Sequence, residues 1–97
     1  MITVTDCGPL GIKITCEPDD EYEYIRCDSS LAGLFYLRHR DNVAHVFYIK
    51  DKKGYWSEDS FPYDQMRNKD SCKITKVTEK ISDIKLTKEQ YNSIANN

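Results

Sequence analysis

LFYLRHRDNVAHVFYIK, residues 34–50, is the stretch that decides the fold of this chain. Two runs of aromatic and β-branched residues flank a short polar segment, and this pattern is typical of a β-hairpin. Asp41 and Asn42 both tolerate the backbone of a two-residue turn. With these two residues as the turn, Arg38 is expected to lie opposite His45.

A helix is the alternative for residues 29–40. Asp28 or Ser29 would be its N-cap, and Leu31 and Leu34 would begin its apolar face. The β-branched and aromatic residues favour the hairpin from Leu34 onward, which leaves residues 29–33 as a loop or a single helical turn.

Alternating apolar residues predict more strands on both sides of the hairpin. We expect these strands at residues 1–5, 11–16, 21–27 and 72–79, with a turn at residues 51–54 leading into Tyr55 and Trp56. Residues 57–71 have no clean period and are expected to form a long loop, with one helical turn after Pro62. Thr87-Lys88-Glu89-Gln90 is a capping box, which predicts a short helix at residues 88–95.

The expected fold is therefore a single α+β domain over residues 1–97. It is a small antiparallel sheet of about five or six strands with a short C-terminal helix, and a partly open barrel is the alternative closure of the same strands. Ninety-seven residues are enough for one hydrophobic core.

The composition predicts a cytoplasmic protein without membrane association. No apolar run reaches the length of a membrane span, and residues 1–11 lack the features of a signal peptide. The four cysteines are expected to be reduced thiols, and Cys16 and Cys27 continue the alternation of apolar residues, as buried side chains do.

The sequence carries no recognisable catalytic or metal-binding motif, so we predict a protein that is not an enzyme and needs no metal or cofactor. His39 and His45 are the two histidines, and neither has a local signature of a catalytic partner. The cysteines also lack the short paired spacing of zinc ligands.

Two surfaces favour a non-catalytic module that binds a larger protein, as an inhibitor or an adaptor. The first is an acidic–aromatic edge made of Glu17, Asp19, Asp20, Glu21, Tyr22, Glu23 and Tyr24. The second is the loop at residues 57–71, where Phe61, Tyr63 and Met66 are the candidate anchors. Virus- or phage-encoded proteins that act on host machinery provide a class-level analogy. The sequence also leaves open the formation of a homodimer.

Both surfaces have a structural interpretation as well. The acidic residues would then form a solvated turn and an edge strand protected from aggregation, and Phe61 and Tyr63 would fold back onto the core.

The alternative function is binding of single-stranded nucleic acid by one face of the hairpin. That face would show Tyr36, Arg38, Arg40, His45 and Phe47. Aromatic rings interleaved with cations can stack on bases and hold phosphates. A sequence pI of about 5.6 opposes this alternative, because such binding depends on neutralising phosphates.

Overall fold

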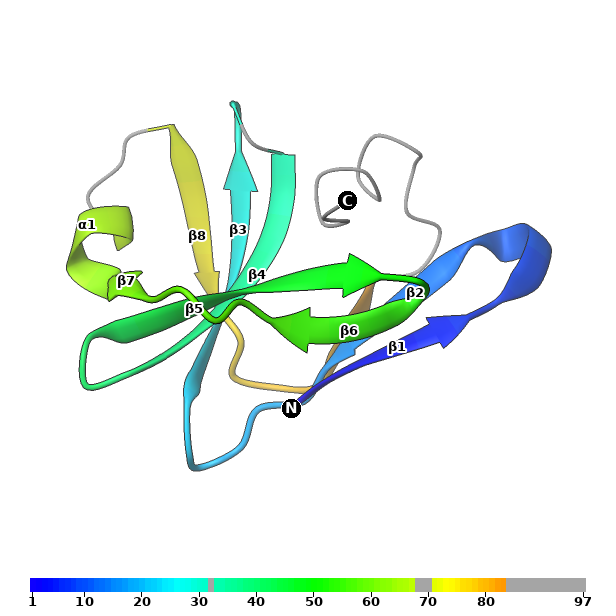
Figure 1. Cartoon of the computed structure of the whole chain (residues 1–97), viewed down its shortest axis with the longest axis horizontal. Helices are drawn as coiled ribbons and strands as arrows, with labels where there is room; N and C mark the ends of the chain where they lie inside the picture. Colours follow the sequence, from blue (N-terminus) through cyan, green and yellow to red (C-terminus); the bar gives the residue numbers. More distant parts are fainter. Residues whose placement is uncertain (32, 68–70, 84–97) are drawn as a thin grey trace.

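The computed structural model describes residues 1–31, 33–67 and 71–83, in two antiparallel sheets and one short helix (Figure 1). The larger sheet contains β3 (Glu23–Ser29), β4 (Gly33–Arg40), β5 (Val43–Lys50), β6 (Lys53–Trp56), β7 (Phe61–Pro62) and β8 (Cys72–Lys76). The smaller sheet contains β1 (Ile2–Asp6), β2 (Ile12–Cys16) and β9 (Ile81–Asp83). A 3₁₀ turn, η1 (Gly8–Leu10), joins β1 to β2, and helix α1 spans Tyr63–Arg67.

The small antiparallel-sheet domain expected from the sequence is confirmed, but the described chain is mostly sheet, so α+β fits it only roughly. The strands also divide between two sheets, of six and three strands, which the sequence did not predict. The helix predicted at residues 88–95 lies outside the described residues. Within those residues, α1 is too short to cross a lipid bilayer, and no other helix could do so.

The hairpin of β4 and β5 has the predicted turn and register. Arg38 lies opposite His45, and Arg40 lies opposite Val43. Asp41 and Asn42 have φ angles of 52° and 64°, as a tight hairpin turn requires of both central residues. The helical alternative for residues 29–40 is wrong, because β4 covers residues 33–40.

Strand β5 pairs with three strands along its length. Its first half, up to Val46, pairs with β4 and, at Val43 and Ala44, also with β7, whereas its second half, from Phe47 onward, pairs with β6. A second tight turn at Asp51 and Lys52 joins β5 to β6, with φ angles of 53° and 61°. The Lys52 ammonium lies 3.0 Å from an Asp6 carboxylate oxygen, so this ion pair connects the turn to the end of β1.

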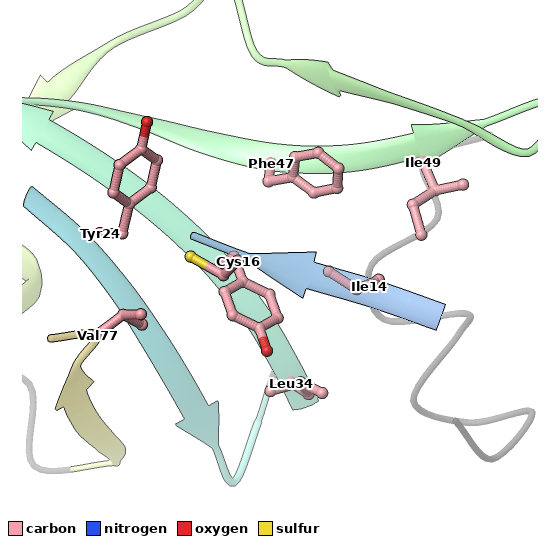
Figure 2. Close-up of a cluster of buried hydrophobic side chains, with 8 residues drawn as sticks. Ile14, Cys16, Tyr24, Leu34, Phe47, Ile49 and Val77 are labelled. Atoms are coloured by element: carbon pink, nitrogen blue, oxygen red, sulfur yellow. The ribbon is translucent and has the colours of Figure 1, made fainter. Parts of the chain in front are cut away.

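The smaller sheet covers one face of the larger one, and the first hydrophobic core lies between them (Figure 2). Its buried members are Ile14, Cys16, Tyr24, Leu34, Tyr36, Phe47, Ile49 and Val77. Burial removes apolar surface from water, and this core therefore holds the two sheets together.

A second core lies on the opposite face of the larger sheet, under β7 and α1. Its buried members are Ile25, Cys27, Phe35, Leu37, Ala44 and Tyr63, and Phe61, Met66, Val46 and Ile74 pack against it. The central strands β3 and β4 therefore bury side chains on both faces. The helical turn expected after Pro62 is present as α1, and β7 adds two strand residues, so residues 57–71 are not simply a long loop.

The cysteines are free thiols in this structure, and Cys16 and Cys27 are fully buried, as their place in the alternation predicted. Burial raises the pKa of Cys16 to about 11 and the pKa of Cys27 to about 12. Both thiols therefore stay protonated at neutral pH and behave as small apolar side chains.

Candidate functional site: an arginine between two aromatic rings

The guanidinium of Arg38 lies against two aromatic rings that pack on the first core. Its Cζ atom is 4.2 Å from the ring centre of Tyr22 and 4.4 Å from the ring centre of Trp56. Both distances are well within the range of an attractive cation–π interaction. We refer to Tyr22, Arg38 and Trp56 as the Arg38 stack.

Two members of the Arg38 stack lie in strands, and the third is held by a hydrogen bond in the loop before β3. Arg38 lies in β4, opposite Tyr24 of β3 and His45 of β5. Trp56 ends β6 opposite Phe47, and its ring packs edge-on against Phe47 with centroids 5.3 Å apart. The backbone N–H of Tyr22 donates to an Asp19 carboxylate oxygen at 3.2 Å. The stack is therefore formed before any ligand arrives.

Arg38 is half-buried, yet no carboxylate of the described residues lies within ion-pair distance of it. Its Nε is buried and has no hydrogen-bond partner within the described ranges. Arg26 is the informative contrast, because it pairs with both Asp28 and Asp83. A buried polar group without a partner is uncommon and calls for an explanation.

Arg40 and His45 lie on the same face of the hairpin as Arg38. His45 Nδ1 is 2.9 Å from the backbone carbonyl oxygen of Ser57. A carbonyl oxygen can only accept, so Nδ1 carries the hydrogen and Nε2 is left as the second ring nitrogen. Arg40 is exposed, and its Nε is 3.9 Å from the carboxylate of Asp41.

An open groove of about 510 Å³ adjoins the stack at Tyr22. Its walls come from the acidic segment at residues 18–24, from residues 39–41 at the β4–β5 turn, and from residues 76–78 after β8. We refer to this feature as the groove. It gathers carboxylates, cations and aromatic rings from three separate parts of the chain.

Asp19 organises the acidic wall of the groove. One of its carboxylate oxygens accepts hydrogen bonds from the backbone N–H groups of Glu21 and Tyr22, at 2.9 and 3.2 Å. The other accepts from the Tyr24 hydroxyl at 2.5 Å and from the N-terminal ammonium of Met1 at 3.1 Å. The bond from Tyr24, together with the ammonium and the two amides, lowers the pKa of Asp19 to about 2 despite some burial. This carboxylate is committed to holding the loop.

Glu23 is committed to internal contacts in the same way. Its two oxygens lie 3.0 Å from His39 Nε2 and 3.0 Å from Lys76 Nζ. Burial raises the pKa of Glu23, but the hydrogen bonds and charges of these two partners outweigh it and leave the pKa below its ordinary value. The His39 ring in turn stacks on Tyr63, with centroids 3.8 Å apart.

The acidic–aromatic edge predicted from the sequence is therefore divided into three groups. Asp19, Glu23 and Tyr24 serve the fold, and Tyr24 is only 2% exposed. Tyr22 belongs to the Arg38 stack. The exposed remainder is Glu17, Asp20 and Glu21, which we call the acidic rim.

The anchors predicted in residues 57–71 pack against the second core. Tyr63 is buried there, and Phe61 and Met66 are half-buried against the same cluster. The structural interpretation of this segment describes it better than the expectation of exposed anchors, because β7 and α1 cover apolar residues of β3, β4 and β5.

The predicted nucleic-acid face is only partly assembled. Arg38, Arg40 and His45 share a face, but the expected stacking rings of Tyr36 and Phe47 are 0% and 2% exposed, within the first core. The aromatic partners of Arg38 are instead Tyr22 and Trp56, which sequence reasoning did not place there. The signal that could have found Tyr22 is its alternation with Tyr24, which lies opposite Arg38.

A basic–aromatic surface exists on the outward side of the β5–β6 hairpin instead. Tyr48 and Tyr55 lie opposite each other and stack, with centroids 5.5 Å apart. Lys50 and Lys53 form the next outward-facing pair along the same two strands. Tyr55 is 42% exposed.

Across residues 1–31, 33–67 and 71–83, no three histidine, cysteine or acidic side chains lie close enough together to hold a metal ion. Comparison of the chain with protein-family models, with curated proteins and with solved structures finds no match.

Proposed function

We propose that this chain is a non-catalytic protein-binding domain that docks on a larger protein through the Arg38 stack and the groove. The observation that carries the proposal is the half-buried Arg38 guanidinium, which lies between Tyr22 and Trp56 without a carboxylate partner among the described residues. Tryptophan, tyrosine and arginine are the residue types that supply most of the binding energy at protein interfaces.

The geometry supports this proposal because the stack is already ordered. Side chains that are fixed before binding lose less conformational entropy when a partner arrives. The acidic rim beside the groove adds a negative field that would steer a basic segment of a partner toward it. A domain that covers a partner's surface in this way acts as an inhibitor or an adaptor. The cytoplasmic location and the virus- or phage-type action on host machinery expected from the sequence belong to the same proposal.

The test is affinity capture from a lysate of the native host. We expect the tagged chain to recover one protein in stoichiometric amount, and Arg38→Met to lose it, because methionine fills the space between the rings without charge or hydrogen-bond donors. Arg67→Met is the matched control, since Arg67 is exposed on α1, which covers the opposite face of the larger sheet. Recovery of the same protein by Arg38→Met at the wild-type level would contradict the proposal.

A second candidate function is binding of single-stranded nucleic acid by the outward face of the β5–β6 hairpin. Stacked Tyr48 and Tyr55 next to Lys50 and Lys53 are the observation that favours it. The test is fluorescence anisotropy of a labelled oligothymidylate at low salt. A Tyr48→Ala/Tyr55→Ala variant should lose the binding, and equal anisotropy changes for this variant and the wild type would exclude this face.

A further inference from the structure

We propose that the Arg38 stack is a receptor for a single carboxylate group of the partner protein, either an aspartate or glutamate side chain or a chain terminus. This inference rests on the proposed function and names the chemistry of its partner. It follows from the shape of the site, from its charge and from the groups beside it.

The shape of the site favours a flat anion. A guanidinium is planar, and its N–H donors all point outward within that plane. The Arg38 Cζ atom lies over the ring of Tyr22 and over the ring of Trp56. A ligand that avoids these two rings would approach the outer N–H groups in the guanidinium plane. A carboxylate is also planar and can accept two parallel hydrogen bonds there, whereas a tetrahedral phosphate needs more room beside the rings.

The charge of the site calls for an anion. Arg38 is half-buried, its Nε has no hydrogen-bond partner in the described part of the chain, and no carboxylate there lies within ion-pair distance. The two rings stabilise the cation through their π faces but accept no in-plane hydrogen bond. A carboxylate from a partner would neutralise the charge and accept from the outer N–H groups of the guanidinium, while Nε itself stays buried.

Within residues 1–31, 33–67 and 71–83, the neighbouring carboxylates are engaged elsewhere. The Asp19 carboxylate is occupied by Tyr24, by two backbone amides and by the N-terminal ammonium. Glu23 is held by His39 and Lys76. Among the groups that the structure describes, none supplies the anion, and we assign the site to an external carboxylate.

The acidic rim favours a protein over a nucleic acid as the binding partner. A polyanion would be repelled by Glu17, Asp20 and Glu21 and by the formal net charge of −2. A protein segment with one carboxylate among basic residues would match both Arg38 and the acidic rim. Its carboxylate would pair with Arg38, and its cations would lie along the acidic rim. We therefore assign the site to an acidic residue that has lysine or arginine neighbours.

Trp56 provides a direct readout, because it is the single tryptophan of the chain and lies against the receptor. The experiment titrates the protein with a blocked lysine–glutamate–lysine peptide and follows Trp56 emission at constant ionic strength. The same peptide with glutamine in place of glutamate, and inorganic phosphate, are the comparison probes. We expect a saturable change with the glutamate peptide and an affinity at least about ten-fold weaker for both comparison probes.

Variants at Arg38 complete the test. Arg38→Met should abolish the response, and Arg38→Lys should weaken it by about ten-fold, because lysine keeps the charge but has no planar fork. Arg67→Gln, which removes an exposed cation from α1 on the opposite face of the larger sheet, should change it little. An equal response to the glutamine peptide, tighter binding of phosphate, or an unchanged response in Arg38→Met would each overturn the inference.

The outcome is separable from that of the proposed function. If Arg38→Met loses the captured partner and the glutamate peptide gives no response, the domain binds protein but the carboxylate assignment is wrong. If the peptide binds at Arg38 while capture from lysate is independent of Arg38, the receptor is real and the proposed docking surface is wrong.

Discussion

Replacing Gly54 with alanine should destabilise the protein, because the added methyl group would displace the ring of Phe47, against which Trp56 packs. Gly54 lies in β6, and a Cβ atom added there would stand 2.3 Å from Phe47 Cζ, 2.7 Å from Phe47 Cε1 and 3.0 Å from Val4 Cγ2. Carbon atoms in contact normally lie about 3.5–4.0 Å apart. Phe47 is 2% exposed and packs against Trp56, so its ring has little room to retreat.

The magnitude follows from two opposing effects. Alanine in an open strand position is roughly 0.5–1 kcal/mol more favourable than glycine, since the unfolded chain loses less freedom. Overpacking a well-filled core costs about 1–3 kcal/mol, and here the clash involves a buried ring. We expect the clash to prevail and Gly54→Ala to lose about 1–2 kcal/mol, which lowers the melting temperature of a domain this size by roughly 4–16 °C.

Urea unfolding followed by Trp56 emission measures this loss. Gly8→Ala is the control, because nothing lies within 4 Å of its added Cβ and any loss comes from its φ of +62° alone. Phe47→Leu removes the ring atoms that clash with the added methyl group. The double variant should therefore lose less unfolding free energy than the sum of the losses of Phe47→Leu and Gly54→Ala. A Gly54→Ala protein as stable as the wild type, or strict additivity with Phe47→Leu, would refute the reasoning.

Three further predictions test other parts of the structure. Asp19→Asn should lower stability by about 1 kcal/mol at pH 7, because the bonds from Tyr24 and the loop amides favour the charged form. The folded protein lowers the pKa of Asp19 from 3.8 to about 2, so the charged carboxylate stabilises the fold above about pH 4, and this stability is lost as the pH falls through 2. Thermal melts between pH 5 and pH 2 should therefore show a steeper fall in melting temperature for the wild type than for Asp19→Asn. Cys16 and Cys27 should resist a disulfide reagent at pH 8 and react only after denaturation, and a native protein with four rapidly reacting thiols would contradict their burial. Tyr36→Phe should leave stability unchanged or raise it by up to about 1 kcal/mol, because the buried Tyr36 hydroxyl has no hydrogen-bond partner in the described ranges. A loss above about 1 kcal/mol in the free energy of unfolding, measured by chemical denaturation, would contradict this prediction.

Local chemistry allowed the hairpin to be predicted from the sequence. Asp41 and Asn42 favour the turn on their own, and a two-residue turn sets the pairing of Arg38 with His45 without reference to the rest of the chain. The burial of Cys16 and Cys27 likewise follows from alternation within one strand.

The exposed face of that hairpin could not be predicted, because alternation assigns one side of a strand to the core and leaves the other to solvent. Residues 34–37 of β4 are all buried, since the smaller sheet covers one side of the strand and α1 with β7 covers the other. Tyr36 was therefore expected at the surface and lies in the core. Its continuous run of apolar residues is the signal of a strand buried on both faces.

The Arg38 stack depends on contacts that are distant in sequence. Tyr22 precedes β3 and Trp56 ends β6, and they reach the same arginine because β3 pairs with β4 and β5 pairs with both β4 and β6. No local pattern encodes this combination of pairings.

The pairing of β2 with β9 has a consequence for how the polypeptide is made. Thr15 and Ser82 touch across these strands although they lie 67 positions apart in the chain. Because a ribosome delivers the chain from its N-terminus, the β1–β2 ribbon emerges long before the strand that completes its sheet. During synthesis the hydrogen-bonding edge of β2 that faces away from β1 stays unpaired until β9 arrives, and we expect newly made chains to be prone to edge-to-edge association in that interval.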